Sequence, residues 1–257
     1  MRLTFLGTGT SQGVPVIACT CAVCQSQDWH DKHLRTSALI ETDAGKNILI
    51  DIGPDFREQM LRAKVTHLDS ILITHAHRDH VGGLDDIRPF NWVQGEKMEI
   101  YCNREARMSI ECDYHYIFSP HKFPGLPDAN LNELTGDEPV VLAAGETVVP
   151  IKAMHKELPV LGYRLGRLAY ITDANHIDKA EIEKLFGVDT LVVNALRKDA
   201  HFSHFCLSEA LGIVEAVAPR VAYLTHVSHE MGLYAVTEKE LPENVHLAYD
   251  GLQIEVG

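Results

Sequence analysis

The amino-acid sequence predicts an α/β protein in which two packed sheets are covered by helices on their outer faces. Short apolar runs rich in branched residues recur from one end of the chain to the other, as in buried strands. Stretches with helical spacing lie between some of these runs, so hairpin-like strand pairs are mixed with crossover helices. No internal repeat, low-complexity tract or linker divides the 257 residues. We therefore expect a single domain over residues 1–257.

The expected strands are apolar runs of a few residues bounded by turn-forming residues. The run Ser70–Ile73 is short, branched and unbroken, which is typical of a buried strand rather than a helix. By the same criteria we expect strands at Leu3–Gly7, Ala38–Thr42, Asn47–Asp51, Ser70–Ile73, Met98–Tyr101, Thr147–Lys152, Gly162–Leu165, Leu168–Ile171, Thr190–Val193, Val221–Leu224, His246–Tyr249 and Leu252–Val256.

Three segments carry helical patterns. The apolar residues from Leu207 to Ala218 recur at helical spacing and stop before Pro219. Asp178 and Glu181 have the spacing of a capping box at a helix start. A further helix should begin at Pro54, and its predicted buried face contains Phe56, Met60 and Leu61.

The segment from His115 to Asp137 shows little periodicity. Its turn-forming residues are Pro120, Pro124, Gly125, Pro127 and Gly136. These features predict a long surface loop over residues 115–137. A loop of this length is either a lid or binding loop or a solvated excursion, and the sequence leaves both open.

The composition indicates a soluble, acidic protein. The chain has 36 acidic and 23 Lys or Arg residues, a formal charge of −13, which argues against non-specific binding to nucleic acid or anionic membranes. The N-terminus lacks a secretory signal, and no stretch approaches the roughly 18 apolar residues that span a bilayer. Three of the six cysteines fall within six positions, which favours metal ligation in a reducing cytoplasm over a disulfide framework. We therefore expect a cytoplasmic location and no membrane partner.

The segment His75-x-His77-x-Asp79-His80 places four potential metal ligands directly after the predicted strand Ser70–Ile73. His75 and His77 alternate and can reach one ion, whereas Asp79 and His80 lie further round the turn and could serve a second. A His-rich surface loop without a metal is the alternative. Imidazoles and a carboxylate at this density rarely serve packing alone, so we predict a metal site.

Further potential ligands lie at the ends of other predicted strands. His155 follows the strand that begins at Thr147, Asp173 ends a run that reads Thr172-Asp173, and His226 ends a run that reads Thr225-His226. Each side chain alone is more often structural than functional. Their common position at the carboxyl ends of strands lets the loops converge on one crevice.

The order His-x-His-x-Asp-His, then His, Asp and His, resembles the metallo-β-lactamase superfamily over nearly the whole chain. The resemblance implies a four-layer αββα sandwich with two divalent metal ions, Mn²⁺ or Zn²⁺, at its edge. It assigns His75, His77 and His155 to one metal and Asp79, His80 and His226 to the other, with Asp173 bridging both. Asp51 resembles the strand-end residue of this family that orients the ligands.

A second constellation, Cys19-x-Cys21-x₂-Cys24, supplies three thiolates on a tight loop. A tetrahedral zinc site needs one more ligand. His229 is the best candidate because it follows His226 closely. Closed coordination of this kind would make the zinc structural; reduced, unligated thiols are the alternative.

The run Gly7–Pro15 before the cysteines, together with Thr225-His226-x-Ser228-His229, narrows the resemblance to the phosphoribosyl 1,2-cyclic phosphate phosphodiesterases of the carbon–phosphorus lyase pathway. His204 resembles a histidine that is thought to act as general acid in this group, and His201 is its rival. The related tRNA-processing ribonucleases carry a long arm between the equivalents of His155 and Asp173. Only seventeen residues separate them here, so we expect no tRNA substrate.

The predicted function is a binuclear metal-dependent phosphodiesterase that acts on a small cyclic or nucleotide-like phosphodiester. Asp79 and His204 are its candidate catalytic residues. Thioester hydrolysis of the glyoxalase II type and lactam hydrolysis are the enzymatic alternatives, because the same site could attack an acyl carbon. A non-catalytic metal-binding protein is the third. The resemblance is compatible with a homodimer, and the physiological substrate stays open.

Overall fold

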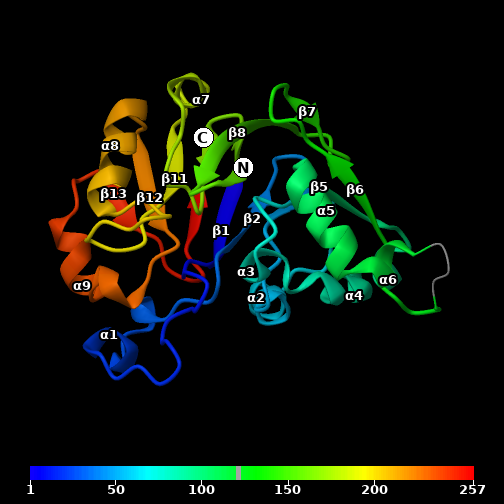
Figure 1. The fold of residues 1–257 in the computed structure, drawn as a ribbon, viewed down its shortest axis with the longest axis horizontal. Coiled ribbons are helices and arrows are strands. Elements are labelled where there is room, and N and C mark those ends of the chain that lie inside the picture. Colours follow the sequence, from blue (N-terminus) through cyan, green and yellow to red (C-terminus); the bar gives the residue numbers. More distant parts are fainter. Residues whose placement is uncertain (120–122) are drawn as a thin grey trace.

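The computed structural model describes residues 1–119 and 123–257, and its strands form two seven-stranded sheets (Figure 1). In the first sheet, the strands from β14 to β3 run antiparallel to their neighbours, and those from β3 to β6 run parallel. Its order is β14 (Gln253–Glu255), β1 (Arg2–Gly7), β2 (Ser37–Glu41), β3 (Asn47–Ile50), β4 (Ser70–Leu72), β5 (Met98–Cys102) and β6 (Ala129–Glu133).

The second sheet is mixed as well. Strands β13 to β10 run parallel, and β10 to β7 run antiparallel. Its order is β13 (Val245–Leu247), β12 (Val221–Thr225), β11 (Thr190–Asn194), β10 (Leu168–Tyr170), β9 (Leu158–Leu165), β8 (Thr147–His155) and β7 (Val140–Val141).

The helices lie outside the paired sheets, with α8 and α9 on one side and α2 to α5 on the other (Figure 1). The α-helices are α1 (Ala22–Gln25), α2 (Phe56–Ala63), α3 (Arg78–Val81), α4 (Arg88–Gln94), α5 (Arg104–Asp113), α6 (His115–Phe118), α7 (Lys179–Glu183), α8 (Leu207–Val217) and α9 (Tyr234–Thr237). Short 3₁₀ turns are η1 (Trp29–Asp31), η2 (Leu84–Ile87), η3 (His229–Met231) and η4 (Glu238–Glu240). None of the described helices combines the length and apolarity needed to cross a bilayer.

Three apolar clusters define the four layers. The cluster between the sheets contains the fully buried rings of Phe5, Tyr163 and Tyr170. In a second cluster, helices α2, α4 and α5 pack against the first sheet, and in a third, helix α8 packs against the second sheet. Because each sheet buries both faces, its strands read as nearly continuous apolar runs. The predicted αββα sandwich is therefore confirmed.

The predicted surface loop over residues 115–137 is wrong in part. Its described residues include helix α6 and strand β6, which extends the first sheet parallel to β5, while residues 120–122 lie outside the described residues. Only Ala129 of β6 is buried. Asn130 and Asn132 instead donate to the carboxylate of Glu99 on β5. An edge strand held by polar side chains lacks the apolar alternation on which the sequence prediction relied. The short strand β7 was missed as well.

Two details of the predicted helices are wrong. The predicted capping box does not form: the side chain of Asp178 makes no capping hydrogen bond, and the carboxylate of Glu181 accepts the backbone N–H of Lys152 on β8 at 2.8 Å. Leu61 was expected in the buried face of α2 but is 62% exposed. Helix α8 ends at Val217, close to the predicted boundary.

Candidate metal centre

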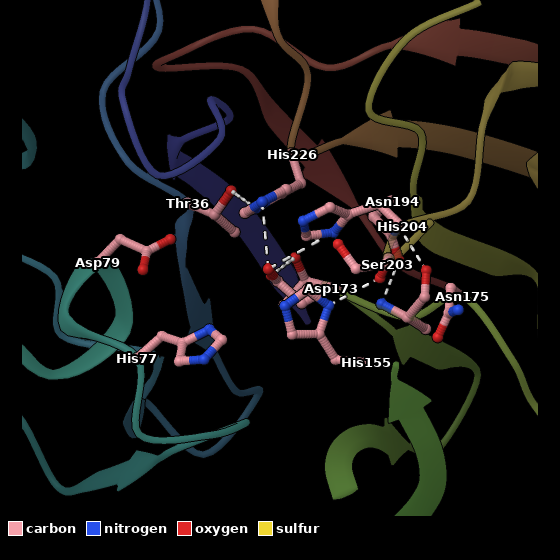
Figure 2. Close-up of polar contacts among 12 residues, drawn as sticks. Thr36, His77, Asp79, His155, Asp173, Asn175, Asn194, Ser203, His204 and His226 are labelled. Carbon is pink, nitrogen blue, oxygen red and sulfur yellow. Dashed lines mark hydrogen bonds and ion pairs between the residues drawn. The ribbon is translucent and has the colours of Figure 1, made fainter. Parts of the chain in front are cut away.

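The side chains that the sequence singles out as metal ligands meet at one end of the sandwich. The carboxyl ends of parallel strands lie at the same edge of a sheet, where loops converge. The positions are His75, His77, Asp79 and His80 after β4, His155 at the end of β8, Asp173 after β10 and His226 after β12. Figure 2 shows Asp173 between His155 and His226, with His77 and Asp79 approaching from the other side. The two sheets therefore each supply part of one site.

Asp173 is the residue that the surrounding groups share. Its Oδ2 lies 3.2 Å from Nε2 of His80, and its Oδ1 lies 3.1 Å from Nε2 of His226. Ligand atoms of Asp79, Asp173 and His226 lie within 4.8 Å of one another, and so do those of His75, His80 and Asp173. A carboxylate that belongs to both groups has the position of a bridge between two ions.

The orientation of the imidazoles tests whether these residues fit a metal. Nε2 of His80 and Nε2 of His226 are buried, and neither has a hydrogen-bond partner in the described part of the chain. Both Nδ1 atoms are hydrogen-bonded, to Asp51 and to Thr36. If the proton sits on Nδ1, the lone pair of each Nε2 faces carboxylate oxygens, so acceptor faces acceptor. A cation between them would be bound by both and would remove this repulsion. The donor set fits a divalent ion, and histidine with carboxylate suits Mn²⁺ or Zn²⁺.

The electrostatics of the site also favour positive charge. Burial lowers the pKa of His80, but the carboxylates of Asp173, Asp51 and Asp79 outweigh it and raise that pKa well above its usual value. Burial raises the pKa of Asp173, but His226 and His80 outweigh it and hold that pKa well below its usual value. The carboxylates thus attract a cation to the space beside Nε2 of His80.

Asp51 orients His80, in the manner expected from the sequence. It is fully buried, and its Oδ2 accepts Nδ1–H of His80 at 2.6 Å. The backbone N–H and the hydroxyl of Thr74 donate to the same carboxylate at 2.8 and 2.9 Å. The two donors of Thr74 fix the carboxylate, and the carboxylate fixes the imidazole of His80.

Thr36 and Ser203 orient two other histidines, and sequence reasoning missed both. The hydroxyl of Thr36 donates to the carbonyl of Gly9 at 2.8 Å and so can accept Nδ1–H of His226 at 3.0 Å. The carbonyl of Ser203 accepts Nδ1–H of His155 at 2.7 Å (Figure 2). A threonine before a strand and a main-chain carbonyl have no distinctive sequence context, so no signal in the chain could have found them.

Replacement of Thr36 by valine is expected to weaken binding of the active-site metal by about tenfold or more, because His226 loses the acceptor that orients it. Thr36→Ser should retain wild-type affinity. Competitive titration with a chromophoric chelator measures the change. Thr190→Val is the matched control, since the buried hydroxyl of Thr190 has no hydrogen-bond partner among the described residues. Equal affinities for all three variants would contradict the orienting role.

Three of these residues adopt an unusual backbone conformation. Asp51, Asp173 and His226 have φ of 61°, 59° and 57°, in the left-handed region. Asp51 and His226 directly follow the ends of β3 and β12, and Asp173 lies three residues after the end of β10. L residues rarely visit this region, which turns the chain sharply after the strand and carries the side chain into the site.

The cysteine cluster and His229 come together as the sequence predicts. Nδ1 of His229 lies 3.3 Å from Sγ of Cys19, 3.3 Å from Sγ of Cys21 and 3.5 Å from Sγ of Cys24. The three cysteines are free thiols. Three sulfur atoms around one imidazole nitrogen match the donor set of a closed tetrahedral zinc site. The four residues stay a predicted structural zinc site, which we name the cysteine lobe.

His204, rather than its rival His201, faces the metal centre. Its Nδ1 lies 3.8 Å from Oδ1 of Asp173, and its ring centroid lies 4.5 Å from that of His155 and 5.0 Å from that of His226. Burial and the neighbouring His226 lower the pKa of His204 to about 3. His201 stacks on the outer side of His204 at 5.3 Å and is only half-buried. The geometry also lets His204 join His155 and Asp173 as a ligand.

Comparisons with known proteins place this site in a family. A family model described as the beta-lactamase superfamily domain matches residues 46–227. The chain is 43% identical over 254 residues to an octanoyltransferase of Porphyromonas gingivalis (strain ATCC BAA-308 / W83), an alignment that covers 98% of this chain and 51% of that protein. The chain thus spans about half the length of this relative.

Solved structures agree. A diphosphatase from the PhnP family superposes with a TM-score of 0.92 at 38% identity, and the match covers 100% of this chain and 98% of that one. The short form of human tRNase Z superposes with a TM-score of 0.71 at 19% identity over 100% of both chains, which shows the fold alone. The chain therefore belongs to the metallo-β-lactamase superfamily and resembles its PhnP family.

Proposed function

We propose that this metal-dependent hydrolase is a phosphodiesterase that acts on a small cyclic or nucleotide-like phosphodiester. Its family supports hydrolysis, and the similarity to a PhnP-family diphosphatase supports a phosphate substrate. The observation that carries the proposal is the pair of buried Nε2 atoms of His80 and His226, which face the two oxygens of Asp173. This arrangement can hold two cations side by side, and a pair of metal ions can stabilise both the attacking and the leaving oxygen in phosphoryl transfer.

The residues of the chain have distinct tasks in this proposal. Bound divalent ions would polarise a phosphoryl oxygen and lower the pKa of a water. Asp79 and Asp173 supply the negative charge that holds the ions together. Asp51 and Thr36 keep the imidazoles in one tautomer, so the reacting groups do not have to reorganise. His204 lies beside Asp173 and hands a proton to the departing alkoxide. The negative charge of a bound phosphodiester opposes the lowering of the His204 pKa by burial and by His226.

The proposed substrate is small rather than a tRNA. The formal charge of −13 opposes binding of a polyanion over a wide surface. Strands β8 and β9 follow each other through a tight turn at Lys156 and Glu157, and β10 follows after Gly166 and Arg167. No long arm therefore projects between His155 and Asp173.

The direct test is turnover by protein reconstituted with Mn²⁺ or Zn²⁺. We expect hydrolysis of bis(p-nitrophenyl) phosphate and of a ribose cyclic phosphate, and no comparable hydrolysis of S-lactoylglutathione or nitrocefin. Activity that survives the double substitution Asp79→Ala and His80→Ala would contradict the two-metal site. Preferential hydrolysis of nitrocefin would replace the phosphodiester by a lactam.

An acyl thioester is the second candidate substrate, because the relative from Porphyromonas gingivalis is named an octanoyltransferase. A water activated at this site could attack an acyl carbon as well as phosphorus. An octanoyl thioester in the same assay separates the two classes. Faster turnover of the thioester than of the cyclic phosphate would favour the acyl substrate.

Substitution of His204 by alanine is expected to lower kcat by roughly 10²-fold or more for a phosphodiester with an alkyl leaving group. The loss should be small for bis(p-nitrophenyl) phosphate, whose phenolate departs without protonation. His201→Ala is the matched control and should change neither rate strongly. Metal content measured by mass spectrometry should stay unchanged. A loss of metal, or equal rate losses for both substrates, would make His204 a ligand rather than a proton donor.

A further inference from the structure

A buried carboxylate outside the metal centre ties together segments that are far apart in the sequence. The side chain of Asp250, in the turn before β14, is 7% exposed. Its Oδ1 accepts the backbone N–H and the hydroxyl of Thr8 at 3.0 and 2.8 Å. Its Oδ2 accepts the backbone N–H of Leu34 at 2.9 Å and Nη1–H of Arg62 at 3.4 Å. Four donors from three other segments therefore converge on one carboxylate.

The two backbone segments that Asp250 holds lie on either side of Gly9. Thr8 directly precedes Gly9, and the backbone N–H of Gly9 donates to the carbonyl of Leu34 at 2.8 Å. The carbonyl of Gly9 accepts both the backbone N–H of Thr36, at 3.0 Å, and its hydroxyl, at 2.8 Å. Asp250 therefore fixes the segment whose carbonyl orients the hydroxyl of Thr36.

Both the ring and the main chain at His226 are attached to this segment. The hydroxyl of Thr36 accepts Nδ1–H of the His226 ring at 3.0 Å (Figure 2). The next residue, Val227, donates its backbone N–H to the carbonyl of Thr8 at 2.9 Å. The carboxylate of Asp250 is thus connected to His226 by two hydrogen-bonded routes, although it does not touch His226 itself.

The groups around Asp250 require an acceptor on every side. All four are N–H or O–H donors, and an ionised carboxylate offers them acceptor sites only. Burial raises the pKa of Asp250 to about 6, although the donors from Leu34, Thr8 and Arg62 oppose that rise. The carboxyl group is therefore mostly ionised at neutral pH. Asparagine has the same shape, but its NH₂ group would face one of the donors, and that hydrogen bond would be lost.

We propose that Asp250 is a positioning residue of the metal centre, which acts through Thr8 and Thr36 to hold His226 in the orientation that binds a cation. The inference rests on the proposed metal-dependent function and adds to it a residue that touches neither the metal nor the substrate. Groups that orient a ligand directly change metal affinity by about 10- to 100-fold. Because Asp250 lies further from the ligand than Thr36 does, its effect should be smaller.

The first test is the affinity of the metal-depleted protein for Mn²⁺, measured from the electron paramagnetic resonance signal of the free ion. Mn²⁺ prefers histidine and carboxylate ligands to the thiolates of the cysteine lobe. Asp250→Asn should weaken Mn²⁺ binding by roughly three- to tenfold. At saturating Mn²⁺, kcat on bis(p-nitrophenyl) phosphate should return toward the wild-type value, and KM should not change, because no group that contacts the substrate is altered.

Asp69→Asn is the matched control. Asp69 is also a buried carboxylate, 8% exposed, and it accepts the backbone N–H of Asn47 at 2.8 Å. It lies directly before β4, whereas the candidate ligands follow β4, so it is at the end of the strand away from the metal centre. Its replacement should leave Mn²⁺ affinity unchanged. Wild-type affinity in folded Asp250→Asn protein, or equal losses in Asp69→Asn and Asp250→Asn, would overturn the proposal.

A double-mutant cycle separates positioning from a general loss of stability. If Asp250 acts through Thr36, the double variant Asp250→Asn and Thr36→Val should lose clearly less Mn²⁺ affinity than the product of the two single losses. Single losses that multiply would overturn the proposal, because the two residues would then act independently.

A second variant covers the case in which Asp250→Asn protein does not fold, which thermal unfolding reveals. Thr8→Val removes a single donor from the same carboxylate and should also weaken Mn²⁺ binding, whereas Thr8→Ser should not. Unchanged affinity in Thr8→Val would overturn the proposal. Because Mn²⁺ affinity is measured without a substrate, these results stand even if no phosphodiester is hydrolysed, so the two proposals can fail separately.

Discussion

Replacement of Asp173 by alanine is expected to release the active-site metal and to lower turnover by roughly 10³-fold, since metal ions supply several kcal/mol of transition-state stabilisation. The two oxygens of Asp173 lie 3.1 Å from His226 and 3.2 Å from His80. Without these oxygens, no carboxylate lies between His80 and His226 to bind both cations. Metal content per chain and kcat on bis(p-nitrophenyl) phosphate are the measurements.

The control for this substitution is Asp189→Ala. Asp189 pairs with Arg167 at the surface, at the other end of the strand pair, and should leave metal content and turnover unchanged. Asp173→Asn keeps the shape of the side chain but loses its charge, so it should bind metal weakly. Wild-type metal content in both Asp173 variants would contradict the proposed role of Asp173 as a bridge between two metal ions.

Replacement of Cys24 by serine is expected to remove one zinc per chain and to unfold the cysteine lobe. Zinc in a closed thiolate site binds with roughly 10 kcal/mol or more of apparent free energy. That amount is comparable with the whole stability of a typical domain. Zinc content by mass spectrometry and thermal unfolding measure the two effects. Cys112→Ser is the matched control, because Cys112 is an exposed free thiol outside the lobe.

The same substitution should also lower turnover. His229 of the cysteine lobe follows the candidate ligand His226 by three residues. Val227 lies between them and pairs with Gly9, whose carbonyl accepts the hydroxyl of Thr36. Loss of the lobe therefore removes support from the loop that carries His226. Wild-type protein that contains no zinc at the three cysteines, or Cys24→Ser protein with unchanged stability, would contradict the structural zinc.

The sequence was sufficient to predict the parts of the protein that local chemistry determines. Buried strands such as β4 and β12 are continuous apolar runs, and the residues that follow them were recognisable as candidate ligands by type and position. The predicted partner of the cysteines, His229, lies beside all three of them. These features need only the residue types and the rule that strand ends converge.

Contacts between distant segments were out of reach. The bond from His226 to Thr36 spans 190 residues, and the role of Thr36 exists only because the carbonyl of Gly9 fixes its hydroxyl. Strand β6 was not predicted because Asn130 and Asn132 donate hydrogen bonds to Glu99 on β5, so the strand has no apolar face to recognise in the sequence.

The left-handed backbone at Asp51, Asp173 and His226 makes the metal centre a compromise between stability and function. Each such residue costs on the order of 1–2 kcal/mol relative to an ordinary conformation, a strain that glycine would avoid. Glycine at any of these positions would relieve the strain and abolish a ligand or its support. Strain at these three residues therefore lowers the free energy of unfolding, and the same backbone conformation directs their side chains into the site. Because glycine adopts this conformation without strain, an Asp173→Gly protein should unfold at a higher temperature than an Asp173→Ala protein.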